Sequence, residues 1–142
     1  MDTSSKNKQT DEKEQDQNKM SKNGIGIKNK SSQNDIKLLI KGLSDNNGLI
    51  RRNHSKALAK AGKDALPALI KTLLNSKKVI QRRAAAKTLK LVEDPTALPH
   101  LIKALTNDTD AVVQFSSAGA IAVFGEAAVN HLITLLDSQK HT

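Results

Sequence analysis

The sequence of 142 residues contains no cysteine, no tryptophan and no tyrosine, and its aromatic residues are Phe115 and Phe124. Without cysteine, neither a disulfide nor a thiolate zinc site can stabilise the fold. With so few aromatic rings, a core has to be built from Leu, Ile, Val and Ala. This composition favours many small contacts between helices over one compact, aromatic-filled centre.

Long hydrophobic runs are also missing. No apolar stretch approaches the roughly 20 residues that a membrane-spanning helix needs. The lysines near the N-terminus are not followed by the apolar segment of a signal peptide. We therefore expect a cytoplasmic protein without a membrane partner.

The net charge of +9 is distributed unevenly along the chain. Residues 1–36 hold seven lysines and six acids, and residues 37–90 hold fourteen Lys and Arg against two acids. Residues 91–142 hold two lysines against six acids. Such asymmetry favours a partner that binds in one orientation. The alternative is that the many Lys and Asn residues partly reflect genomic base composition.

The first 33 residues are polar, and only Ile25 and Ile27 could be buried. Such a segment cannot offset the ordering entropy of its backbone, which is about 1–2 kcal/mol per residue. We predict that residues 1–33 form a disordered tail. A repeat domain is expected at 34–138, followed by a short C-terminal tail at 139–142.

From Asn34 onward, apolar residues recur with a helical period. The pattern predicts seven helices, as three hairpins and a last helix at 126–138. "LPALIKTL" at 66–73 returns as "LPHLIKAL" at 98–105, and pairs such as Ala57-Leu58 and Thr88-Leu89 recur at steps of 31 or 32 residues. These repeats predict an all-α fold, a short α-solenoid of about three and a half helical hairpins.

Residues at the predicted helix ends agree with this division. Pro67 and Pro99 lie near helix starts, where a missing N–H costs little. Gly62 is typical of a C-terminal stop, and Asp94 before Pro95 is typical of an N-cap. Ala85 is expected at a closely packed helix interface.

The segments "IRRNHSKAL…G…ALPALIKTL" and "RRAAAKTLKLVEDPTALPHLIKALTND" resemble the short HEAT-like repeat of phycobilisome lyases and of bacterial and archaeal scaffold proteins. "SSAGAIAVFGEAAVNHLITLLD" is similar to repeats of phycobilin lyase subunits. This resemblance implies binding to a phycobiliprotein and help in attaching its bilin. The chain departs from the pattern in its middle unit, where Glu93 and Gln81 replace the usual Gly and apolar residue. No catalytic motif matches.

The candidate binding surface consists of basic residues on the second helix of two hairpins. In HEAT-like stacking these helices line the concave side, so their basic stripes would lie next to each other. The alternative is an ordinary solvated face. The predicted partner-binding set is Arg51, Arg52, Lys56, Lys60, Arg82, Arg83, Lys87, Lys90 and, as an aromatic contact, Phe115.

Phe115 aligns with Arg52 and Arg83 of the preceding repeats, where an aromatic ring is a candidate hot spot. The alternative is that a local shift buries it. Phe124 is expected in the core. His54 aligns with Ala85 and Ser117 and is interpreted as a packing irregularity.

Metal binding and catalysis find little support in the sequence. His100 and His131 align in neighbouring repeats, but stacked helices lie about 8–10 Å apart, and metal ligands need about 2 Å. The carboxylates of Glu93 and Asp94 fall in a turn. We expect no metal, no catalytic residue and no cofactor, with a bilin only if the chain is lyase-like.

The sequence therefore predicts a non-catalytic scaffold whose basic concave face docks an acidic protein, with a phycobiliprotein as one candidate. The first alternative is a phycobilin lyase subunit or accessory factor. The second is nonspecific nucleic-acid binding, for which no interleaved aromatic residues provide base stacking. The last helix is apolar on a broad face. We therefore predict that it associates with a second copy or a partner subunit.

Overall fold

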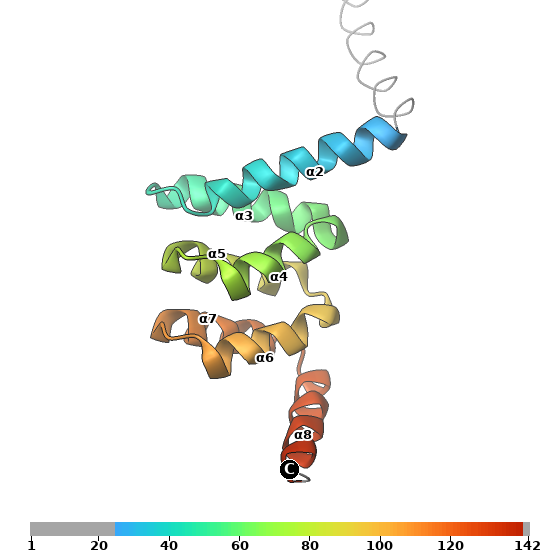
Figure 1. Ribbon diagram of the computed structural model, residues 1–142, viewed down its shortest axis with the longest axis vertical. Helices are drawn as coiled ribbons and strands as arrows, with labels where there is room; N and C mark the ends of the chain where they lie inside the picture. Colours follow the sequence, from blue (N-terminus) through green and yellow to red (C-terminus); the bar gives the residue numbers. More distant parts are fainter. Residues whose placement is uncertain (1–24, 141–142) are drawn as a thin grey trace, which may run out of the picture. The chain divides into compact units, whose positions relative to one another are not determined.

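The computed structural model describes the backbone of residues 25–140 and the side chains of residues 32–139. Within this part, seven α-helices and no strand are present, as predicted. Short 3₁₀ turns at Gly62–Asp64 and Pro95–Ala97 lead into two of the helices. The helices are α2 (Ile25–Gly42), α3 (Gly48–Ala61), α4 (Leu66–Asn75), α5 (Val79–Val92), α6 (Leu98–Asn107), α7 (Ala111–Ala122) and α8 (Glu126–Lys140) (Figure 1).

The chain divides into two units, Met1–Asp35 and Ile36–Thr142, and the second unit carries the repeats. In that unit the first helix of each hairpin lies in one layer and the second helix in another (Figure 1). The second helices α3, α5 and α7 pack side by side, with α5 in the middle. Helix α4 packs against α5 and α6, and α6 against α7. The result is the predicted short α-solenoid.

Helix α2 begins earlier than the sequence pattern predicts. Its backbone is helical from Ile25, although the apolar period begins only near Asn34. Extending an existing helix by one residue costs less than nucleating a new one, and residues 25–33 contain no proline that would stop it. The rest of the predicted N-terminal tail, residues 1–24, and the C-terminal residues 141–142 lie outside the described residues.

The predicted helix ends are confirmed. Pro67 and Pro99 occupy the first turns of α4 and α6. Gly62 ends α3 with a φ of 61°, in the left-handed region that glycine adopts without strain. The Asp94 side chain accepts a hydrogen bond from the Thr96 N–H and so caps the 3₁₀ turn before α6.

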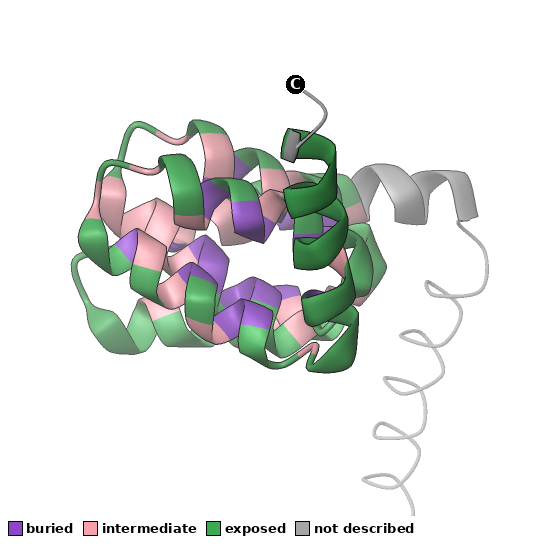
Figure 2. Ribbon diagram, turned by 90° about the horizontal axis from the view of Figure 1, so that it is seen from below, coloured by how far each residue is buried: buried purple, intermediate pink, exposed green. Residues whose placement is uncertain are grey.

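The core lies between the two layers and is aliphatic. Its largest fully buried side chains include Leu43, Leu58, Leu69, Leu89 and Leu101, and Ala85 is completely buried in α5. Figure 2 shows buried residues where helices of the stack face one another. Phe124 is half-buried and packs against this core, whereas His54 is half-buried on α3. Alanines at the interfaces let the helices approach closely.

In the middle repeat, Gln81 and Glu93 replace the usual apolar residue and glycine. The first makes structural hydrogen bonds, and the second has a strained backbone. Gln81 donates from Nε2 to the carbonyl of Ile40 at 2.9 Å and accepts from the Ser76 hydroxyl, so both ends of its half-buried amide have a partner. Glu93 ends α5 with a φ of 54°, the same value as Gly125 after α7. A side chain in this conformation is strained, and Glu93 therefore has an unfavourable backbone geometry.

Helix α8 exposes most of its apolar residues (Figure 2), whereas Ala128 near its start is buried and belongs to the core. Leu136 is 60% exposed and Ile133 is 52% exposed. Association through this face stays a prediction. Among the described residues, no single helix is long and apolar enough to cross a membrane. Helices α7 and α8 reach that length and composition only together, across a bend of 117°.

Candidate binding groove

A groove of about 550 Å³ crosses the layer of second helices and takes residues from α3, α5 and α7. Five of its lining residues are basic and none is acidic. All five basic residues belong to the partner-binding set that the sequence predicts, and the structure brings them together. The lining residues are Gly48, Arg51, Arg52, Ser55, Ile80, Arg83, Ala84, Lys87, Lys90, Leu91 and Val112.

The groove also contains apolar residues that the predicted binding set does not include. Ile80, Leu91 and Val112 line it together with the cations. Leu91 is 55% exposed and Val112 is 45% exposed, although both are large aliphatic side chains. Leu91 lies one turn after Lys87, so the helical period could have indicated it. The groove therefore offers apolar surface as well as positive charge.

Arg51 and Arg82 occupy equivalent positions in successive repeats and make the same local contact. The Arg51 guanidinium donates to the carbonyl of Asp45 at 2.6 Å, and that of Arg82 donates to the carbonyl of Ser76 at 2.9 Å. In both repeats this hydrogen bond fastens the second helix to the turn before it. The equivalence supports the repeat alignment.

Arg82 does not line the groove, contrary to its predicted place on the binding surface. Its guanidinium makes two hydrogen bonds to the Asp108 carboxylate, at 2.9 and 3.2 Å, and its side chain is only 13% exposed. Asp108 lies in the turn before α7, so the pair connects two repeats. An arginine that is mostly covered and paired in this way is structural, and we exclude it from the candidate site.

Arg83 lies in the groove wall and pairs with Asp110, the N-cap of α7. Its Nε and Nη2 each donate to the carboxylate at 3.2 Å. The hydrogen bond from Arg83 lowers the pKa of Asp110, and the Val113 N–H lowers it further. Within residues 32–139, ion pairs are formed by Arg82 and Arg83. The lysines of the groove thus keep their charge available to a ligand.

Three further residues of the predicted set lie outside the groove lining. Lys56 and Lys60 are exposed on α3, on the same helix as Arg52. Phe115 on α7 is 81% exposed, so the alternative in which it is buried is wrong. It lies one helical turn after Val112 of the groove. An exposed aromatic ring beside a groove is a candidate contact for a protein partner.

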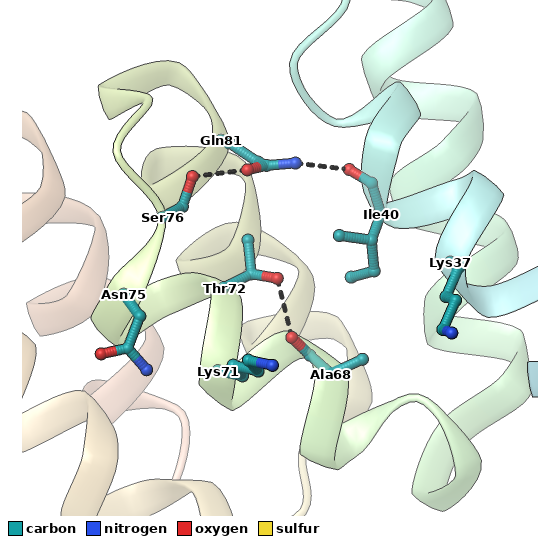
Figure 3. Close-up of a pocket in the computed structure, with 8 residues that line it drawn as sticks. All are labelled: Lys37, Ile40, Ala68, Lys71, Thr72, Asn75, Ser76 and Gln81. Atoms are coloured by element: carbon teal, nitrogen blue, oxygen red, sulfur yellow. Dashed lines mark hydrogen bonds between the residues drawn. The ribbon is translucent and has the colours of Figure 1, made fainter.

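The layer of first helices carries a second depression of about 440 Å³, between the end of α2 and α4 (Figure 3). Its polar groups are largely engaged in the fold: the Thr72 hydroxyl donates to the Ala68 carbonyl at 2.7 Å, and Gln81 bridges Ser76 and Ile40. Lys37 and Lys71 are its charged residues. Because it lies on the layer of first helices, this depression can serve as a control surface in binding experiments on the groove.

Two sets of residues that the sequence raises for metal or acid–base chemistry can be located in the described part of the chain. No group of three or more His, Asp or Glu side chains in that part is placed to hold a metal. Glu93 and Asp94 form part of a turn, and the pKa of Asp94 is lowered mainly by the backbone N–H of Thr96 and then by its hydroxyl. This carboxylate caps a helix turn.

Comparisons with known proteins agree with this architecture. The chain is 44% identical over 62 residues to the bilin biosynthesis protein MpeU of Synechococcus sp. (strain WH8020). The match covers 44% of this chain and spans about a fifth of that relative, 21% of its length. The family model described as HEAT repeats matches residues 36–122. The chain therefore belongs to the HEAT-repeat family, whose arrays are typical protein-interaction scaffolds.

Proposed function

We propose that this chain is a non-catalytic scaffold that docks an acidic protein in the groove formed by α3, α5 and α7. The observation that carries this proposal is the groove lining, which contains five Lys and Arg residues and no acid. A positive cleft of this kind attracts and orients an acidic surface. The apolar side chains of Ile80 and Leu91 supply area that can be desolvated on binding.

The mixture of charge and apolar surface favours a protein over a nucleic acid. Phosphate contacts need only Lys and Arg, and exposed aliphatic residues such as Leu91 and Val112 add little to them. Protein interfaces combine an apolar centre with a polar rim. The groove likewise combines apolar side chains with charged ones.

Co-precipitation from a lysate of the native cells tests this proposal with two matched variants. One reverses three charges on the second helices, Arg52→Glu, Lys56→Glu and Lys87→Glu. The other reverses three exposed charges on the first helices, Lys37→Glu, Lys71→Glu and Lys103→Glu, and has the same net charge. Acidic proteins captured by the wild type and by the second variant, but not by the first, support the proposal. Equal capture by both variants contradicts it.

A second candidate is a role in bilin handling, favoured by the similarity to a bilin biosynthesis protein. In this reading the acidic partner is a phycobiliprotein, and the chain acts as a lyase subunit or accessory factor. A bilin carries propionate carboxylates on an apolar framework. Cations such as Arg52 and Lys87 beside Leu91 and Val112 match those two properties.

Bilin transfer separates this second candidate from the first. Purified chain is incubated with a free bilin and an apo-phycobiliprotein, and covalent product is followed by its fluorescence after denaturing electrophoresis. Product formed faster with the chain than without it supports bilin handling. Binding of the phycobiliprotein without any gain in product supports the scaffold alone.

A further inference from the structure

Three equivalent positions on the second helices carry two arginines and one phenylalanine. Arg52 on α3, Arg83 on α5 and Phe115 on α7 are separated by 31 and 32 residues, the repeat length. Because the three helices pack side by side in this order, these positions form a row across the layer. Its members change from cation to cation to aromatic ring.

A second row repeats this change in character. Lys56 on α3 and Lys87 on α5 are equivalent and exposed, and Gly119 takes their position on α7. Helix α7 contains no charged residue between Ala111 and Ala122. It exposes Val112 and Phe115 instead. Positive charge is thus confined to α3 and α5, and apolar exposure dominates on α7.

The distance between neighbouring helices of the layer corresponds to about three residues of an extended peptide. Packed helices lie about 8–10 Å apart, and an extended chain advances about 3.3 Å per residue. Every third residue of an extended segment that crosses the layer therefore reaches the next helix. A segment with side chains three residues apart can contact Arg52, Arg83 and Phe115 in turn.

We propose that the groove recognises an extended acidic segment in which two carboxylates and one large apolar residue follow one another at every third position. The carboxylates lie over α3 and α5, and the apolar residue lies against Phe115 and Val112. This inference rests on the proposed function and specifies the chemistry of the partner. Charge complementarity selects the segment, and the change from cations to an aromatic ring fixes its orientation.

The contacts of the two arginines are consistent with this role. Arg52 makes no hydrogen bond or ion pair with residues 32–139, so its guanidinium is available to a carboxylate. In Arg83, Asp110 engages Nε and Nη2, which leaves Nη1 for a ligand and holds the guanidinium in one orientation. A positioned arginine loses less side-chain entropy when it binds.

Two labelled peptides of identical composition test the spacing. The first is Glu-Ser-Ser-Glu-Ser-Ser-Phe between short Gly-Ser flanks, and the second is Glu-Glu-Ser-Phe-Ser-Ser-Ser between the same flanks. Fluorescence anisotropy measures their affinity for the full chain. We expect the first peptide to bind about tenfold more tightly, a difference of about 1.4 kcal/mol.

Variants of the chain assign the contacts. Phe115→Ala should reduce the affinity for the first peptide toward that for the second, and replacing the peptide phenylalanine by serine should then cost much less than it does with the wild type. Arg52→Glu should weaken both peptides, whereas the matched reversal Lys71→Glu should change neither. Circular dichroism melting confirms that each variant is folded.

Two outcomes overturn the inference in distinguishable ways. If both peptides bind equally well and Arg52→Glu weakens both, the groove binds acidic segments without regard to spacing, and only the further inference fails. If Arg52→Glu and Lys71→Glu weaken binding equally, net charge drives association, and the proposed function fails as well.

Discussion

The imidazole of His54 on α3 occupies the space in which a side chain at Gly42 on α2 would begin. A Cβ atom added to Gly42 would overlap the His54 ring. The Nδ1 atom of His54 also lies 3.3 Å from the carbonyl oxygen of Leu39. The first hairpin therefore depends on a glycine opposite a histidine, where the later repeats carry Ala85 and Ser117 at the histidine position.

Gly42→Ala should destabilise the domain by about 1–3 kcal/mol, because the new methyl group overpacks the interface. Urea unfolding measures this difference. Adding His54→Ala should remove most of the penalty, since the smaller side chain restores the space. If Gly42→Ala costs the same in both backgrounds, the two residues are not in contact.

Glu93→Gly should stabilise the domain by about 1 kcal/mol. Glu93 has a positive φ that side chains disfavour and that glycine adopts freely. Thermal melting of the variant should give a higher midpoint than the wild type. Glu93→Ala is the matched control: it removes the carboxylate but keeps the strain, so an equal gain from it would assign the effect to charge.

Ser117→Ala should also raise stability, by about 1 kcal/mol. The Ser117 hydroxyl is fully buried on α7 and has no hydrogen-bond partner among the residues whose side chains the structure describes, and burying such a group is unfavourable. Its equivalent in the preceding repeat is already Ala85. Chemical denaturation that shows a loss of stability would indicate that the hydroxyl makes a contact within the folded domain.

Asp110→Asn should make the domain less sensitive to acid. The pKa of Asp110 is lowered below its ordinary value of 3.8 in the folded state. Its ionised form therefore stabilises the fold above pH 3.8, and this contribution is lost as the pH falls through the lowered value. The stability of wild type and variant should differ at neutral pH and converge in strong acid. Asp64→Asn, at an exposed site, serves as control.

Most of the architecture is predictable from periodicity. The apolar stripes, Gly62, Pro67 and Pro99 locate the helices because each acts through local backbone chemistry. The basic groove is partly predictable, since the repeat alignment places Arg52 next to Arg83. The apolar residue Leu91 is harder to predict, because it joins the groove only through its position one helical turn after Lys87.

Arg82, which we predicted for the binding surface, shows a limit of prediction from the pattern of one helix. Arg82 and Arg83 are neighbours in sequence with the same charge, yet Arg82 packs against Asp108 outside the groove and Arg83 lines the groove. Their difference depends on the turn before α7, 26 residues away. Both arginines pair with a carboxylate near the start of α7, but the Arg82 side chain is 13% exposed and the Arg83 side chain 38%. A pattern along one helix cannot show which of its paired cations stays accessible. The early start of α2 has a similar cause, because helix propagation does not require an apolar stripe.

Site-specific photo-crosslinking tests the central claim most directly. A photoreactive benzoylphenylalanine is placed at Leu91, which lines the groove, or at Asn75, which lines the depression on the first helices. Both positions are exposed, and neither replacement changes a charge. With the co-precipitated partner bound, irradiation should give a covalent adduct from position 91 and none from position 75. An adduct from position 75 with none from position 91 would contradict docking in the groove.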